Sequence, residues 1–227
     1  DCVPELVAGN ENFELFTEGD PLYHSMLASI AGARECIDLE NYIFAADEVG
    51  WRFAEALAER AAQGVGVRLH LDAVGCMFQR SRRMENYLRK HRVKLRWYHR
   101  WSWRRPSRYS RRNHRKFLVV DKHEAYLGGF NIHRESSREF SGSAAWRDSH
   151  VRFRGPLATQ ASELFDAFWK GDREYLPTTA GPQSSLLIPT QTRACRHRLR
   201  CLYRDFLTGP AGSLELTPPY FAPDSRP

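Results

Sequence analysis

The sequence predicts an α/β protein with a mostly parallel or mixed β-sheet that is covered by helices on both faces. Strand-type runs rich in β-branched and aromatic residues alternate along the chain with segments of helical hydrophobic periodicity. Helices of this length between strands allow the crossover connections that parallel strands need. With 227 residues, 42% of them hydrophobic, the chain is long enough to bury a sizeable core.

The elements in the first third of the chain alternate between strand and helix. Asp20 is the expected N-cap of the first helix, because Pro21 follows it in the first turn. Gly64 ends the second helix, which has an apolar face. The predicted ranges are strand Asn12–Phe16, helix Asp20–Ala33, strand Cys36–Phe44, helix Glu48–Gln63 and strand Val65–Asp72.

The rest of the predicted sheet follows the same logic. A helix and a strand precede two short strands at Lys116–Val120 and near Gly128, and a further strand and helix follow them. The other ranges are helix Arg82–His91, strand Val93–Tyr98, strand Asp148–Phe153 and helix Pro156–Trp169.

The most specific pattern in the chain is H-x-K-x4-D-x6-G-G-x-N, without a gap. Because His114 and Lys116 are two residues apart in a strand-type run, they project to the same face. An imidazole is a nucleophile, and a lysine cation neutralises charge that builds on phosphoryl oxygens. The alternative, a strand pair with a basic edge and a Gly-Gly turn, does not explain all six positions: His114, Lys116, Asp121, Gly128, Gly129 and Asn131.

The net charge of +7 is distributed unevenly. Between Arg80 and Lys116 there are sixteen Lys or Arg residues and one acid, Glu85, so the rest of the chain carries a net charge of −8. A concentrated basic patch beside the motif attracts anionic surfaces, either acidic lipid headgroups or nucleic acid.

The part of this patch from Arg96 to Arg112 holds seven arginines and five Trp or Tyr residues. Aromatic residues favour the membrane–water interface, and arginine pairs with phosphates, so this stretch is a candidate for contact with anionic lipid. The alternative places Trp97 and Tyr98 in the core of a strand and the arginines in a solvated loop. Nucleic-acid binding would use the same residue types.

Other chemical classes find little support in the sequence. The histidines show no metal-ligand spacing, so we expect neither a metal nor a cofactor. The five cysteines form no C-x-x-C pair, and we expect free thiols. The sequence contains no run of about 18 apolar residues, so it predicts no transmembrane helix.

The chain divides into a first domain at 1–170, a linker at 171–185 and the start of a second repeat at 186–227. Residues Leu214–Asp224 align without gaps with Ile37–Asp47, at an offset of 177 residues. At this offset a second His-x-Lys would lie near position 291, after Pro227, so we expect this repeat to be truncated. The alternative is a chance similarity of two short strands.

Several stretches of the chain carry a family resemblance. Almost all of Phe13–Trp169 resembles the amino-terminal half of bacterial cardiolipin synthases of the phospholipase D superfamily, whose HKD signature is the pattern above. The resembling stretches are Asp38–Gly50, Arg112–Lys116, Tyr126–Ser136, Trp146–Val151 and, for the opening of the second half, Leu216–Asp224.

The resemblance implies a role for each motif residue. His114 is the expected nucleophile, which forms a phosphohistidine, and Lys116 and Asn131 bind the phosphate beside Gly129. Asp148 is expected to be a buried acid that orients the histidine. Asp121 belongs to the motif and is usually structural. Beyond the motif, Glu40 either reaches the site or pairs with a buried arginine.

The implied reaction is cardiolipin synthesis from phosphatidylglycerol, or from phosphatidylglycerol and another phospholipid. The family's second motif supplies a histidine that acts as acid and base, and it is absent here. We therefore expect either a missing second HKD half or a homodimer partner to complete the site, peripherally on the cytoplasmic side of the bacterial inner membrane. The alternatives are a nuclease or phosphodiesterase acting on DNA, and a catalytically incomplete half-enzyme.

Overall fold

The computed structural model describes residues 13–99, 104, 112–172, 175, 185, 187–190, 193–209 and 213. Within these residues, seven strands form one sheet in the order β1-β7-β6-β5-β2-β3-β4. The strands are β1 Glu14–Phe16, β2 Cys36–Asn41, β3 Gly66–Asp72, β4 Lys94–Tyr98, β5 Phe117–Val120, β6 Glu124–Gly128 and β7 His150–Arg154. The helices are α1 Gly19–Gly32, α2 Glu48–Ala62, α3 Arg82–Lys90, α4 Arg138–Ser141, α5 Pro156–Lys170 and α6 Arg193–Thr208.

The sheet is mixed, as predicted. Strands β2, β3 and β4 are parallel, and α2 and α3 make the crossovers between them. Strand β5 pairs antiparallel with β2, and the antiparallel pairing continues through β6 and β7 to β1.

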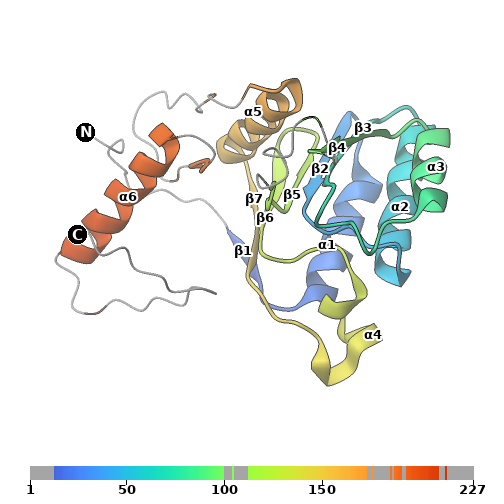
Figure 1. Ribbon diagram of the computed structural model, residues 1–227, viewed down its shortest axis with the longest axis horizontal. Coiled ribbons are helices and arrows are strands. Elements are labelled where there is room, and N and C mark those ends of the chain that lie inside the picture. The colour runs from blue at the N-terminus through green and yellow to red at the C-terminus, as the bar shows by residue number, and fades with distance from the viewer. Residues whose placement is uncertain are drawn as a thin grey trace.

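Helices cover both faces of the sheet, which confirms the predicted layers (Figure 1). Residues from α1, α2 and α3 share the larger core with inward-facing residues of the strands, among them Leu39 and Leu118. Helix α5 packs on the other face, where Phe165 meets Phe117 and Val119. Successive residues of β5 thus point to opposite cores, as the two-residue period of a strand requires.

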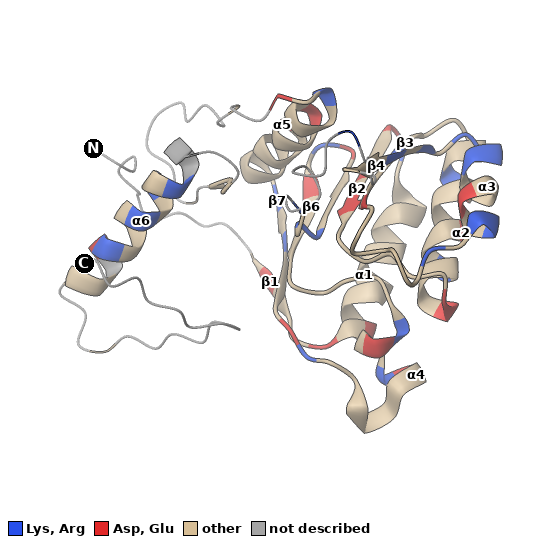
Figure 2. Cartoon of the chain, in the orientation of Figure 1, with Lys and Arg blue, Asp and Glu red and all other residues tan. Residues whose placement is uncertain are grey.

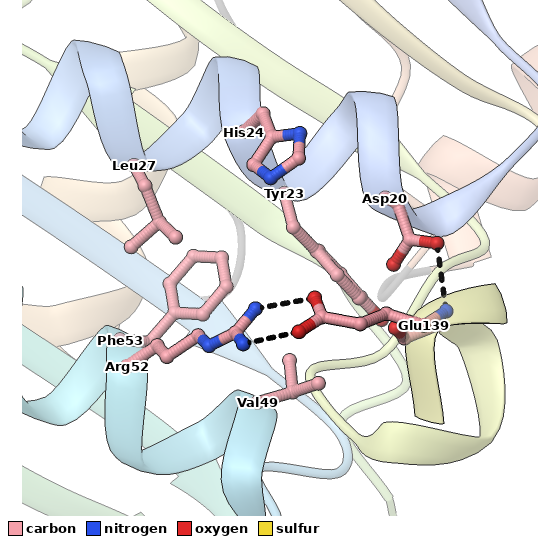
Figure 3. A pocket seen from close by; sticks show the side chains of 9 residues that line it. Asp20, Tyr23, His24, Leu27, Val49, Arg52, Phe53 and Glu139 are labelled. Carbon is pink, nitrogen blue, oxygen red and sulfur yellow. Dashed lines mark hydrogen bonds and ion pairs between the residues drawn. The ribbon is translucent and has the colours of Figure 1, made fainter. Parts of the chain in front are cut away.

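The start of α1 differs from the prediction. Its N-cap is Glu18 rather than Asp20, which lies in the first turn. The Asp20 carboxylate instead accepts a hydrogen bond from the backbone N–H of Arg138 at 2.9 Å. Arg52 of α2 and Glu139 form a bidentate ion pair across the same small pocket, with N–O distances of 2.7 and 2.6 Å (Figure 3). These contacts attach α4 to α1 and α2.

The carboxy-terminal predictions fall largely outside the described residues. Most of the predicted linker at 171–185 and all of Leu214–Asp224 lie outside the described residues. Helix α6 was not predicted. The expected free thiols are present at Cys36 and Cys76, but the prediction was wrong for Cys201, which is disulfide-bonded. No helix among the described residues has the length and apolar character needed to cross a bilayer.

Candidate active site

The motif lies where the parallel strands end. Because β5 runs antiparallel to β2, with Phe117 opposite Glu40, the residues before β5 lie beside the carboxyl end of β2. The carboxyl end of β3 is adjacent, since β2 and β3 are parallel neighbours. This is the edge of an open α/β sheet at which ligands bind.

His114 and Lys116 are in direct contact, although both precede β5 and neither belongs to a strand. The Lys116 Nζ is 3.1 Å from each ring nitrogen of His114 and 3.0 Å from the His114 carbonyl oxygen. The lysine is 3% exposed, whereas the histidine is exposed to solvent. The Tyr42 ring packs on both, with its centre 4.6 Å from that of His114 and 5.3 Å from Nζ.

The local environment sets the charges of this pair. Burial lowers the pKa of Lys116 to about 8, against the opposing effect of the Asp148 carboxylate. Desolvation, followed by the charge of Lys116, lowers the pKa of His114. At neutral pH the site therefore holds a neutral imidazole beside a cation, which is the state that a nucleophile and its phosphate-binding partner need.

Asp148 is close to this pair but does not lie as predicted. It is exposed and precedes β7, and its Oδ1 accepts a hydrogen bond from the Ser149 N–H at 2.7 Å. Its influence on His114 and Lys116 is electrostatic. The negative charge of Asp148 opposes the lowering of the pKa of each residue, but burial outweighs it. The carboxylate occupies the space beside Gly129, where a Cβ would lie 2.0 Å from Oδ1. Only glycine admits the acid at this position.

Two hydrogen bonds from other segments of the chain hold Asn131 in a fixed orientation. Its side-chain oxygen accepts a hydrogen bond from the Ile43 N–H at 3.1 Å, and its carbonyl accepts one from the Tyr23 hydroxyl at 2.6 Å. With the amide oxygen fixed, the two hydrogens on Nδ2 are the part of the side chain left for a phosphate oxygen.

Asp121 is at the opposite end of β5. Its carboxylate accepts three backbone hydrogen bonds, from Arg34 at 2.9 Å, Glu35 at 2.7 Å and Cys36 at 2.9 Å. Partial burial raises the pKa of Asp121, but these hydrogen bonds outweigh it and the pKa is lowered. The contacts fasten the start of β2 to the end of β5, which supports the structural reading.

Glu40 is a buried partner of the residues on either side of His114. It accepts a short hydrogen bond from the Asn113 side chain, and its Oε2 lies 3.5 Å from the Arg115 guanidinium. Asp72 at the end of β3 accepts the Asn113 backbone N–H at 2.8 Å. Both acids are fully buried. The sequence analysis offered a buried arginine as an alternative partner of Glu40, whereas the Arg115 side chain is 26% exposed.

Sequence reasoning missed Asp72, Asn113 and Tyr42 as parts of this site. The signal was their position: Asn113 directly precedes the motif, Asp72 ends the predicted strand Val65–Asp72, and Tyr42 lies near the end of the predicted strand Cys36–Phe44. His150, the first residue of β7, is 2% exposed and has no hydrogen-bond partner for either ring nitrogen among the described residues. Burial, and then the charge of Lys116, lowers the pKa of His150 to about 3.

The predicted aromatic and basic loop is mostly outside the described residues. Of Arg96–Arg112, only residues 96–99, 104 and 112 are described. Within the described ranges of the chain, no group of three or more His, Cys, Asp or Glu side chains is arranged to hold a metal ion.

A family model described as "Cardiolipin synthase, PLD-like domain" matches residues 26–169, which include the whole motif and Asp148. The chain belongs to this family. Cardiolipin synthase 1 of Staphylococcus aureus is 30% identical over 95% of the chain, and the cardiolipin synthase of Listeria monocytogenes is 25% identical over 97%. These alignments cover 46% and 48% of the relatives, so the chain spans about half the length of the curated relatives it matches.

Solved structures agree on the fold. The phospholipase D family member Nuc from Salmonella typhimurium superposes with a TM-score of 0.54 at 21% identity, over 72% of this chain and 99% of its own. NucT from Helicobacter pylori gives a TM-score of 0.55 at 15% identity, over 71% and 97% of the two chains. The phospholipase D-like sheet is therefore confirmed.

Proposed function

We propose that the chain is the first catalytic half of a phosphatidyltransferase of the phospholipase D type. Such an enzyme makes cardiolipin from two molecules of phosphatidylglycerol, or from one phosphatidylglycerol and another phospholipid. The observation that carries the proposal is the contact between an exposed, neutral His114 and the buried cation of Lys116. A phosphodiester that approaches the histidine comes close to the positive charge of Lys116, and Asn131 is the proposed second phosphate ligand, since the Ile43 N–H fixes its side-chain oxygen and leaves its N–H groups to donate. The family to which the chain belongs supports this reaction class.

Two balanced steps follow from this arrangement. A ring nitrogen of His114 attacks the phosphorus of phosphatidylglycerol, the P–N bond forms, the P–O bond to glycerol breaks, and glycerol leaves with a proton from a second histidine. An acceptor lipid then gives its hydroxyl proton to that second histidine and attacks the phosphorus, which releases His114. Lys116 and the Asn131 amide stabilise the charge on the phosphoryl oxygens in both steps.

The second histidine comes either from a second HKD half or from a partner copy of this chain. A second repeat is favoured, because the 177-residue offset moves α1 to 196–209, and α6 spans Arg193–Thr208. Because the substrates are membrane lipids, we place the enzyme peripherally at the membrane, on the cytoplasmic side of the bacterial inner membrane.

A lipid product assay on phosphatidylglycerol vesicles tests the proposal, with a size-exclusion trace of the same preparation. We expect cardiolipin from the full protein and none from His114→Ala with an unchanged circular dichroism spectrum. His123→Ala is the matched control, because this histidine is exposed and precedes β6, at the far end of β5 from the site. Transfer that survives in His114→Ala contradicts the nucleophile assignment, and DNA cleavage without lipid transfer favours the nuclease alternative.

A further inference from the structure

The turn that joins β3 to α3 presents an apolar side chain to solvent. In residues 73–80, Phe78 is 91% exposed and Met77 is 47% exposed, and both are large hydrophobic residues. Single exposed apolar residues are common on soluble proteins, so exposure alone indicates nothing. We call residues 73–80 the β3–α3 finger.

The base of the finger is well ordered by hydrogen bonds. Asp72 accepts the backbone N–H groups of Val74 and Gly75 at 2.8 and 3.0 Å. Cys76 is fully buried, and its sulfur accepts the Phe44 N–H at 3.3 Å and donates to the Tyr42 carbonyl at 3.4 Å. The fold therefore holds Phe78 outward from a fixed turn.

A basic surface begins directly after the finger. Figure 2 shows Lys and Arg along α3, at the outer margin of the molecule. Glu85 is the one acid between Arg80 and Arg96, and it is paired with Arg80. The exposed cations on α3 and the start of β4 are Arg82, Arg83, Arg89, Lys90, Arg92 and Lys94.

The finger and the catalytic histidine share a support. Asp72 accepts hydrogen bonds from the finger through one carboxylate oxygen and from the Asn113 N–H through the other. Tyr42, whose ring packs on His114, accepts the Cys76 thiol through its carbonyl oxygen. A surface that the finger contacts is therefore held at a fixed position relative to His114.

From these observations we infer that the β3–α3 finger and the basic surface of α3 dock the protein on an anionic phospholipid bilayer, with Phe78 inserted among the lipids. This inference rests on the proposed function, which requires lipid substrates at His114. An apolar side chain next to cations matches the boundary between acyl chains and anionic headgroups. A second copy of the chain is a poorer occupant, because a twofold contact would place six exposed cations opposite six others.

Vesicle co-sedimentation of the full chain tests this docking surface. The probes are vesicles of mixed phosphatidylglycerol and phosphatidylcholine, and vesicles of phosphatidylcholine alone. We expect Phe78→Ser to weaken binding to the mixed vesicles by about tenfold, from lost apolar burial. Each of Arg82→Gln and Lys90→Gln should weaken it by about fivefold, and less at high salt. Leu15→Ser is the matched control, because Leu15 is 61% exposed on β1 at the other edge of the sheet.

The outcomes separate docking from catalysis. Unchanged vesicle binding in Phe78→Ser, or equal loss in Leu15→Ser, overturns the proposal. So does a Phe78→Ser variant that loses self-association or DNA binding and keeps its vesicle binding. Because co-sedimentation needs no turnover, His114→Ala should bind vesicles like the parent even if the proposed transfer reaction proves wrong.

Discussion

At the scale of single residues, the site depends on one buried cation. Lys116 is enclosed by the protein and touches both ring nitrogens of His114. Burial brings its pKa to about 8, so the ammonium group loses its proton far more readily than a solvated lysine does. The charge that would bind a phosphate is consequently sensitive to mildly alkaline pH.

The pH dependence of transfer should show this cation. With Lys116 intact, kcat/KM should fall as the pH rises through about 8, because the neutral amine no longer stabilises the phosphoryl oxygens. In Lys116→Arg the guanidinium stays charged, so the fall should disappear even if the maximal rate is lower. A pH–rate profile of both proteins checks this. An alkaline limb that persists unchanged in Lys116→Arg would assign it to another group.

At the scale of elements, the two ends of β5 have different roles, one in the candidate active site and one in fixing the sheet. The residues before it carry the candidate chemistry, and the residue after it, Asp121, binds three successive backbone N–H groups at the start of β2. Because both elements are central in the sheet, this contact fixes how β2 and β5 pair. It therefore acts on the site only through the sheet.

Asp121→Ala should separate stability from activity. We expect a loss of about 1–3 kcal/mol in the free energy of unfolding, since three backbone N–H groups lose their acceptor. The activity per folded molecule should stay near that of the parent, because about five residues of extended chain, roughly 17 Å, lie between Asp121 and Lys116. Urea unfolding and an active-site-normalised assay measure the two quantities. A large fall in activity with unchanged stability would instead make Asp121 a member of the site.

At the scale of the whole molecule, two buried histidines link stability to pH. Burial lowers the pKa of His70 to about 4 and that of His150 to about 3, whereas a solvated histidine titrates near 6.5. Below pH 6.5 these two histidines bind protons in the unfolded chain, whereas in the folded chain they stay neutral until the pH is much lower. The stabilisation is therefore complete above about pH 6.5 and is lost as the pH falls toward 4 and 3.

His150→Leu should reduce this acid sensitivity. Both ring nitrogens lack hydrogen-bond partners within the described residues, so an apolar side chain of similar size removes a titrating group without breaking a contact of that kind. We expect a smaller difference in unfolding free energy between pH 7 and pH 5 than in the parent, measured with urea. An equal or steeper difference would show that other groups determine the acid limb.

Much of the core and part of the site follow from local sequence patterns. The apolar period of Glu48–Gln63 and the position of Gly64 place α2 correctly, because an amphipathic helix and its end signal are local properties. The spacing of His114 and Lys116 likewise predicts their contact. The N-cap of α1 was misplaced because Asp20 has a tertiary partner in α4, which no local pattern reveals.

The supports of the site are non-local, which is why the sequence did not identify them. Asn113 meets Glu40 across 73 residues and Asp72 across 41, and these contacts exist only once β2, β3 and β5 are neighbours. The exposed position of Asp148 has the same origin. Its strand begins two residues later than predicted, so the carboxylate lies in a loop beside Gly129.

The exposure of His114 has a chemical consequence. A phosphorylated imidazole that projects into solvent is open to attack by water as well as by a lipid hydroxyl, and water is by far the more concentrated nucleophile. Whatever covers this side chain during turnover therefore determines whether the lipid chain is passed on or hydrolysed. The ratio of cardiolipin to phosphatidic acid among the products would report how completely the covering surface excludes water from His114.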